Sequence, residues 1–243
     1  IKRGERVVEV GPGKGVLTKE LLKKGAEVTA VEIDSELAEI LRKELGDNKN
    51  LKIINQDILD FIPASRPASP DKLIGNIPYQ ITSPLLRKIF KLDNPPELII
   101  LMVQKEVAER ICAKTGDSRR GFLSVVVQYY AKPKIIRIVP KESFYPIPRV
   151  ESAIIRIATS YQQTANSIWK QEAESRKLFK IIQAGFSQKR KKLRNSLSAG
   201  LRIEPKKMDK VLQKIGIDSN LRAEDLGVED WMKIRNKLKG NKK

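Results

Sequence analysis

The stretch that decides the fold is RVVEVGPGKG, residues 6–15. Its first half is a short apolar run that predicts a buried strand, and its second half holds three glycines spaced G-x-G-x-G. Glycine allows a sharp turn and a close approach of the backbone to a ligand, so such a turn between a strand and a helix is typical of nucleotide-binding α/β folds. A glycine-rich turn that binds nothing is the alternative.

Short β-branched runs and helical patterns alternate after this turn. Further strands are expected in residues 27–33, 51–54, 72–75, 98–103, 124–130, 135–139 and 152–157. Helices are expected in residues 16–24, 35–45, 85–90 and 105–113. The alternation predicts an α/β fold with a mainly parallel, doubly wound, Rossmann-like sheet. The last strands are joined by short turns, which predicts an antiparallel edge.

The strand pattern stops near Thr159. The polar residues 160–167 indicate a linker, and residues 63–70 indicate a proline- and serine-rich surface loop. Four helical segments follow, in residues 178–185, 189–197, 206–214 and 223–238. We therefore expect a catalytic, cofactor-binding domain in residues 1–160 and a small all-helical domain in residues 161–243.

The charge of the chain is strongly positive and uneven. The net charge is +19, which indicates a polyanionic partner such as nucleic acid. Residues 161–243 hold 21 Lys and Arg against 9 Asp and Glu, whereas residues 1–160 hold 27 against 20. The helical domain is thus the more strongly charged part and is expected to bind the polyanion. An anionic membrane surface and a basic structural protein of the ribosome are the alternatives.

What the sequence lacks excludes several kinds of chemistry. There is no histidine, which removes serine–histidine catalysis and histidine-ligated zinc, so we expect no metal. One cysteine, Cys112, rules out an intrachain disulfide and fits a reducing compartment. No apolar run approaches the roughly 18 residues that span a bilayer, so a soluble cytoplasmic protein is expected. The chain lacks an initiator Met, and we expect that its natural N-terminal segment is missing.

Two carboxylates complement the glycine turn. Glu32 ends the second strand, where it can accept both hydroxyls of an adenosine ribose. Asp57 follows the third strand and can accept a hydrogen bond from an adenine amine, although an Asx turn or helix cap is its alternative. NAD fits less well than S-adenosylmethionine, because the glycine spacing differs and histidine is absent. The sulfonium of S-adenosylmethionine is already activated, so positioning and electrostatics suffice for transfer.

The sequence Asn76-Ile77-Pro78-Tyr79 follows the fourth strand at the same carboxyl edge. An adenine N6 amine is a poor nucleophile, because its lone pair is delocalised into the ring. The Asn76 side-chain oxygen and a backbone carbonyl of Ile77 or Pro78 can accept its two N–H groups and free that lone pair. Proline holds these carbonyls in place, and Tyr79 can stack on the base, a contact worth about 1–3 kcal/mol. A plain proline turn after a strand is the alternative.

Taken together, these motifs resemble the ribosomal RNA adenine dimethyltransferase family, the KsgA/RsmA group together with the Erm resistance methylases. The resemblance rests on EVGPGKGVLT, VEID, QD, GNIPYQITSPLL, MVQKEVAERI, FLSVVVQYY and FYPIPRVESAII, which follow in order through residues 7–157. It implies two successive methyl transfers from S-adenosylmethionine to the N6 of each of two adjacent adenosines in a 3'-terminal hairpin of 16S rRNA. It also implies a role in assembly of the small ribosomal subunit.

The resemblance also implies roles for individual residues. The catalytic residues would be Asn76, Pro78, Tyr79 and Phe144, the last beside a flipped adenine. The cofactor would be bound by Glu9, Gly11, Gly13, Glu32, Ile33, Asp57, Ile58 and Asn76. Phe144 taken alone would be a core or loop aromatic.

The C-terminal sequence discriminates within the family. AGFSQKRKKLRNSL (residues 184–197) and LRAEDL (residues 221–226) resemble the small-subunit enzymes more than the resistance methylases. A basic cluster there suits RNA phosphates, and a solvated helix face is its alternative. The residues expected to bind RNA are Lys189, Arg190, Lys191, Lys192, Arg194, Arg119 and Arg120. The expected partner is 16S rRNA within a precursor of the small subunit, bound by a monomer.

Two features depart from the small-subunit pattern. Nothing in the chain matches the G-Q-x-F-L-type segment with which family members begin, and Ile77 stands where small-subunit enzymes more often have Leu. An Erm-type methylase of 23S rRNA, and a non-catalytic RNA-binding assembly factor, are therefore the rival functions.

Overall fold

The computed structural model describes residues 1–64, 70–92, 95–159 and 172–239, which divide into two compact units. The first unit contains Ile1–Ala108 and Ala131–Tyr161, and the second contains Glu109–Tyr130 and Gln162–Lys243. A single boundary at residue 160 therefore does not describe Glu109–Tyr130. This segment joins the second unit because its apolar side chains, such as Val125, belong to the core of the C-terminal helices. The expected linker at 160–167 lies outside the described residues.

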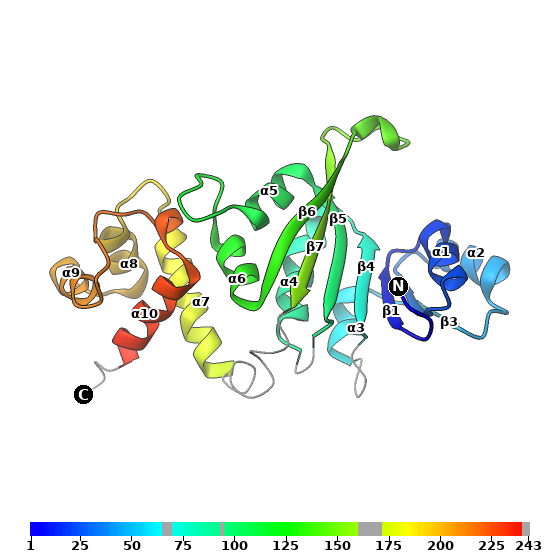
Figure 1. Cartoon of the computed structure of the whole chain (residues 1–243), viewed down its shortest axis with the longest axis horizontal. Helices are drawn as coiled ribbons and strands as arrows, with labels where there is room; N and C mark the ends of the chain where they lie inside the picture. Colours follow the sequence, from blue (N-terminus) through cyan, green and yellow to red (C-terminus); the bar gives the residue numbers. More distant parts are fainter. Residues whose placement is uncertain (65–69, 93–94, 160–171, 240–243) are drawn as a thin grey trace. The chain divides into compact units, whose positions relative to one another are not determined.

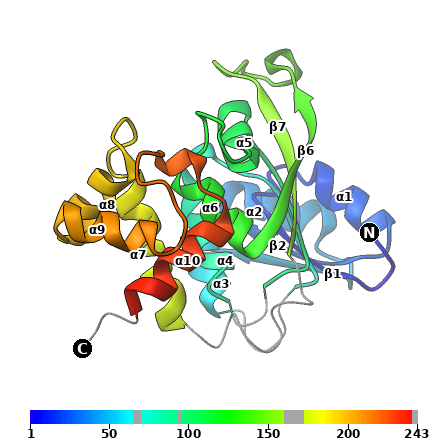
Figure 2. The same cartoon turned by 60° about the vertical axis from the view of Figure 1, so that its left-hand side comes forward.

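A seven-stranded sheet forms the first unit, with the strand order β3-β2-β1-β4-β5-β7-β6 (Figures 1 and 2). Its strands are β1 (Arg6–Val10), β2 (Glu27–Glu32), β3 (Leu51–Asn55), β4 (Lys72–Asn76), β5 (Leu98–Gln104), β6 (Ala131–Val139) and β7 (Ser152–Thr159). The first five pair in parallel, and β7 runs antiparallel to both β5 and β6. This confirms the predicted α/β class with an antiparallel edge.

Helices follow each of the parallel strands. They are α1 (Val16–Lys23), α2 (Ser35–Leu45), α3 (Ile58–Ala64), the short 3-10 helix η1 (Tyr79–Ile81), α4 (Thr82–Ile89) and α5 (Lys105–Cys112). Helices α1 and α2 bury Leu21 and Leu41 against Val28 and Ala30 of the sheet. The helix expected at 85–90 begins earlier, at Thr82, so that Pro84 lies inside its first turn. Of the loop expected at 63–70, the first two residues end α3 and 65–69 lie outside the described residues.

The strand expected at 124–130 is wrong, because these residues belong to the helix α6 (Phe122–Tyr130). Valine favours strands, and the run SVVV suggested one. The helix instead buries residues around most of its circumference, including Leu123, Val126 and Val127. An apolar run with such burial has no polar face, so its helical period is hidden in the sequence.

The second unit is helical. Besides α6 it contains α7 (Glu172–Phe186), α8 (Leu193–Leu201), α9 (Pro205–Gln213), the 3-10 helix η4 (Ala223–Asp225) and α10 (Val228–Lys239). Its core includes Leu178, Leu197, Met208 and Trp231, all fully buried. The helix expected at 189–197 is wrong in its first part, because α8 begins only at Leu193. No helix in the described parts of the chain is long and apolar enough to cross a membrane.

Close packing in the second unit generates a prediction about stability. Gly185 lies in α7 with no room for a side chain, since a Cβ there would overlap the ring of Trp231. We expect Gly185→Ala to lower the free energy of unfolding by about 1–2 kcal/mol, the cost of overpacking less the gain in helix propensity. Chemical denaturation measures this. Gly121→Ala is the control, because its nearest neighbour would be Arg110 Cδ at 3.9 Å, and an equal loss in both variants would contradict the packing argument.

Candidate active site

The residues predicted to bind the cofactor and those predicted to be catalytic lie at the carboxyl edge of the parallel strands. The glycine turn follows β1, Glu32 ends β2, and Asn76 ends β4. The chain runs from β1 outward to β3 and then returns to β4 on the other side of β1, so the strand order reverses between β1 and β4. Ligands of open α/β sheets bind at such a reversal. A Cβ at Gly11 would lie 3.6 Å from the backbone oxygen of Asn76, so the turn and the start of the Asn76–Tyr79 motif are neighbours.

The glycine turn needs its glycines. The φ angles of Gly11, Gly13 and Gly15 are +64°, +57° and +75°, in the left-handed region that residues with a Cβ rarely adopt. The Gly11 N–H donates to the Val31 carbonyl at 3.0 Å, which anchors the turn to the neighbouring strand. The backbone therefore passes close to the sheet edge without side chains in the way.

Glu32 holds this turn in place. Its carboxylate is 5% exposed, and its Oε2 and Oε1 atoms accept the N–H groups of Gly13 and Asp34 at 3.0 and 3.1 Å. A carboxylate has about four acceptor sites, so two remain for a ligand. Asn55, which the sequence analysis did not single out, donates its Nδ2 to the carbonyls of Glu32 and Ile33. The Ile33 side chain is 67% exposed and leaves an apolar surface beside the carboxylate.

Glu9 lies beneath the turn. Its side chain is 1% exposed, and its Oε2 accepts a hydrogen bond of 2.7 Å from the Thr18 hydroxyl. Desolvation by burial raises the pKa of Glu9 to about 7; the nearby Glu32 charge adds to this, while the Thr18 bond opposes it. Glu9 is therefore less accessible to a ligand than Glu32, the other carboxylate at the turn.

Asp57 serves as a helix cap in the structure. Its Oδ1 accepts the Leu59 N–H at 2.7 Å at the start of α3, which confirms the capping alternative and leaves its other oxygen as a possible ligand acceptor. The Ile58 side chain is buried, with 5% exposure, so only a small part of it faces outward. Both residues lie at the carboxyl end of β3, as the sequence predicted.

The residues Asn76–Tyr79, here called the chemical motif, line a hollow of about 380 Å³. Phe144, distant in sequence, lies in this hollow together with Asn76, Pro78 and Tyr79. Its full lining is Asn76, Ile77, Pro78, Tyr79, Gln80, Phe144, Tyr145, Pro146 and Pro148. The structure therefore brings together all four residues that were expected to be catalytic.

Backbone bonds constrain the motif. The Pro78 carbonyl accepts the Ile81 N–H at 3.1 Å, so one of its two lone pairs is already used. The Thr82 hydroxyl donates to the Tyr79 carbonyl at 3.0 Å, and the Tyr79 hydroxyl lies 2.9 Å from Ser152 Oγ.

The sequence analysis missed Tyr145, Thr82 and Ser152. Tyr145 lines the hollow and is 100% exposed, and an exposed aromatic next to Phe144 was a signal that could have indicated it. Ser152 gave no such signal, because it meets Tyr79 from a segment far away in the sequence. The contact of Thr82 with Tyr79 is local, but it depends on α4 beginning earlier than predicted.

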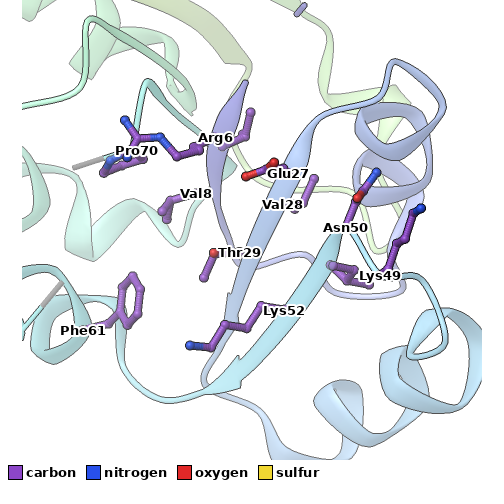
Figure 3. Close-up of a pocket in the computed structure, with 12 residues that line it drawn as sticks. Arg6, Val8, Glu27, Val28, Thr29, Lys49, Asn50, Lys52, Phe61 and Pro70 are labelled. Atoms are coloured by element: carbon purple, nitrogen blue, oxygen red, sulfur yellow. The ribbon is translucent and has the colours of Figure 1, made fainter. Parts of the chain in front are cut away.

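A second hollow, of about 500 Å³, lies at the other ends of the strands (Figure 3). Arg6 and Glu27, which begin β1 and β2, line it together with Phe61 of α3. None of the residues predicted for a site belongs to its lining. In the described part of the chain, no group of three or more Cys, Asp and Glu side chains could hold a metal ion.

The basic residues of the second unit differ in exposure. Arg120 is 1% exposed, and its Nη1 donates to the Ala113 carbonyl and to Gln128 Oε1 at 2.8 and 2.6 Å. The prediction that Arg120 contacts RNA is therefore wrong, because its guanidinium is used inside the unit. Arg119 is exposed but bonds to Asp117 and Glu109, and the Asp117 contact raises the pKa of Arg119.

The cluster before α8 is accessible. Lys189, Arg190, Lys191 and Lys192 are exposed, and Arg194 lies 3.9 Å from Asp209. Lys192 Nζ donates to Asn220 Oδ1 at 2.9 Å, and Lys189 Nζ donates to the Ser118 carbonyl. The first N–H groups of α8 are bonded to the carbonyls of Leu221 and Ser219, so only side chains offer charge to an anion there.

This fold and site define a Rossmann-like methyltransferase. The sequence matches the family described as ribosomal RNA adenine dimethylase over residues 1–239, and the chain belongs to that family. It is 40% identical to the ribosomal RNA small subunit methyltransferase A of Dehalococcoides mccartyi over 95% of this chain and 78% of that protein. It is 36% identical to the Nostoc sp. protein of the same name over 96% of this chain and 88% of that protein.

Solved structures agree. A dimethyladenosine transferase from Plasmodium falciparum has a TM-score of 0.81 and 27% identity, covering 96% of this chain and 90% of that one. The 23S rRNA methyltransferase ErmE has a TM-score of 0.71 and 27% identity, covering 98% of this chain and 93% of that one. The chain is an rRNA adenine dimethyltransferase, and methyltransferases of this kind use S-adenosylmethionine.

The buried Glu9 carboxyl generates a prediction about pH. The pKa of about 7 lies above the ordinary 4.5, so the folded protein holds an extra proton in that window and loses stability as the pH rises through it. Glu9→Gln keeps an acceptor for Thr18 and removes this titration. Thermal denaturation from pH 5 to 8 should favour the variant increasingly over the wild type, up to a limit on the order of 3 kcal/mol. A difference that does not change with pH would contradict the raised pKa.

Proposed function

We propose that this chain dimethylates the N6 atoms of two adjacent adenosines in the 3'-terminal hairpin of 16S rRNA, as a cytoplasmic monomer that acts during assembly of the small subunit. The observation that carries the proposal is the hollow in which Asn76, Pro78, Tyr79 and Phe144 meet, next to the glycine turn. An exocyclic amine needs acceptors and a stacking surface, and this hollow offers both.

The glycine turn and its surroundings fit S-adenosylmethionine. Two acceptor sites of the Glu32 carboxylate remain for the ribose hydroxyls, and the exposed Ile33 side chain offers an apolar wall. The second oxygen of Asp57 can accept from the adenine amine, next to Ile58. Gly11 and Gly13 let the backbone approach, while Glu9 supports the turn from beneath through Thr18. When bound, the cofactor supplies an electrophilic methyl group on sulfur.

Asn76 and its neighbours activate the adenine. The Asn76 side-chain oxygen and the Ile77 carbonyl accept the two N6–H groups and favour a pyramidal nitrogen whose lone pair is free to attack. Tyr79 and Phe144 hold the unstacked base between aromatic surfaces. As the methyl group passes to nitrogen, its bond to sulfur would break and a neutral thioether would leave with the electron pair. The nitrogen becomes positively charged and acidic, so it can lose its proton to water without a protein base.

The small subunit is favoured as the source of the substrate. Relatives at 36–40% identity are named ribosomal RNA small subunit methyltransferase A. The exposed cluster Lys189, Arg190, Lys191 and Lys192, with Arg194, suits phosphates of a folded RNA, and Arg119 adds a charge that is partly neutralised by Asp117. The positive side chains before α8 repel one another and the positive end of the helix dipole. A negatively charged RNA phosphate bound there would reduce this repulsion.

The rival within the family is a 23S rRNA methylase. The similarity to ErmE supports it, as does Ile77 in the motif. The protein should transfer labelled methyl groups to undermethylated 30S particles and not to 23S rRNA. Transfer to 23S rRNA alone would contradict the small-subunit assignment, and transfer to neither would favour a non-catalytic assembly factor.

A substitution at Asn76 tests the proposed chemistry. Removing its acceptor should lower methyl transfer at least a hundredfold, the order of loss for one preorganised transition-state group. RNA affinity in a filter-binding assay should persist, because Asn76 is exposed and ends its strand. Asn48→Ala, in the exposed turn before β3, is the control. If Asn76→Ala lost RNA binding as well, Asn76 would be structural.

The basic cluster can be tested through salt dependence. Changing Lys189, Arg190, Lys191 and Lys192 to Gln removes up to four phosphate contacts, so the slope of log affinity against log salt should decrease by roughly three. The matched control changes four exposed lysines of the first unit, Lys19, Lys23, Lys24 and Lys43, and so loses the same net charge. Equal slopes in both variants would indicate a general charge effect rather than a binding site.

A further inference from the structure

The Tyr79 ring is anchored at its hydroxyl by a buried side chain. The Tyr79 hydroxyl lies 2.9 Å from Ser152 Oγ, and either atom can be the donor. Ser152 is 0% exposed, so no water competes for this bond at the serine. A polar side chain buried this completely needs a partner, and here the partner is Tyr79 of the chemical motif.

Strand topology explains why Ser152 reaches this place. Strand β7 is antiparallel to its neighbours, so its first residue lies at the edge where the parallel strands end. Ser152 pairs with Gln104 of β5 on one side and with Val139 of β6 on the other. The residue before it is fixed as well, because the Lys105 N–H donates to the Glu151 carbonyl at 3.0 Å and the two side chains form an ion pair of 2.6 Å.

Tyr79 is also held at its backbone. The Thr82 hydroxyl, which is buried, donates to the Tyr79 carbonyl at 3.0 Å. A tyrosine held at both its backbone carbonyl and its phenol oxygen has few side-chain rotamers open to it. Its ring therefore keeps one orientation in the wall of the hollow.

We propose that Ser152 is a positioning residue that fixes the Tyr79 ring for the target adenine; this rests on the proposed function. Ser152 begins β7, and the loop that leads into it carries Phe144 into the hollow, so this stretch of chain supplies one aromatic wall and also the partner of Tyr79. The two aromatic walls are thereby set relative to each other before RNA arrives. The bound base then meets a preorganised slot, so more of the bound complex has the geometry that allows methyl transfer.

A double-mutant cycle tests this proposal on the full chain with 30S particles. Tyr79→Phe and Ser152→Ala each remove one half of the same bond. Each should lower kcat about three- to tenfold with little change in KM for RNA, within the range of one uncharged hydrogen bond. The double variant should be no slower than the slower single variant, because the bond can be lost only once.

A spectroscopic readout separates positioning from general destabilisation. In hairpin RNA with 2-aminopurine at the target adenines, a misplaced Tyr79 ring should stack less on the unstacked base, so fluorescence should be quenched less in both single variants than in the wild type. Ser124→Ala is the matched control, because Ser124 is equally buried and donates to the Arg110 carbonyl in the second unit. It should lower the melting temperature without changing kcat or the fluorescence.

The outcomes are distinct. Losses of kcat that multiply in the double variant, or unchanged fluorescence in Ser152→Ala, would overturn the positioning role while leaving the proposed function intact. A wild-type protein that transfers no methyl group to adenine N6 would overturn the proposed function, and the positioning role with it. If the double variant loses no more kcat than the slower single variant, and all the variants melt at the wild-type temperature, the positioning role and the proposed function are both supported.

Discussion

Strand β1 pairs in parallel with β2 on one side and β4 on the other, and this register places the site. Val10 lies opposite Val31 in β2 and Gly75 in β4, so the glycine turn, Glu32 and Asn76 emerge at one level. Gly75 permits the close approach of the strands there, since a Cβ on it would lie 2.6 Å from the Val10 carbonyl oxygen. A slip of one residue would turn every side chain of β1 to the opposite face and separate the turn from the motif.

From this edge outward, the site is built of acceptors and aromatic surfaces and not of a general base. Glu32 fixes the turn, and Asn76, Ile77, Tyr79 and Phe144 line the hollow. The absence of histidine from the sequence is consistent with such chemistry. Methyl transfer to an amine suits this design, because the leaving group is already activated and the nucleophile needs only orientation and a free lone pair.

The sequence predicted most of the sheet and the positions of the glycine turn and Glu32 at its edge well, because these depend on local patterns. The run before Gly11 and the acids after the next strands are short-range signals, and the strands at 6–10 and 27–32 were found almost to the residue. It failed at α6, whose valines suggested a strand while burial on several sides favoured a helix. It also failed at Arg120, because a basic residue beside another basic residue gives no sign that it is buried against Gln128.

What could not be predicted depends on contacts between distant segments. Ser152 and Tyr79 meet only because β7 runs antiparallel, and neither residue type indicates the other. The contact between Thr82 and Tyr79 is local, yet the early start of α4 hid it. Phe144 was found only through resemblance to a family, since nothing in its own neighbourhood points to Asn76.

The proposed roles of Asn76, Tyr79 and Phe144 all require that the methyl group is transferred to the exocyclic nitrogen of adenine. The most direct test of this requirement is mass spectrometry of nucleosides from 30S rRNA, digested after reaction with S-adenosylmethionine that carries a deuterated methyl group. The label should be found in N6,N6-dimethyladenosine, preceded at short times by N6-methyladenosine. Label on a ring nitrogen, on a ribose oxygen or on another base would contradict the account.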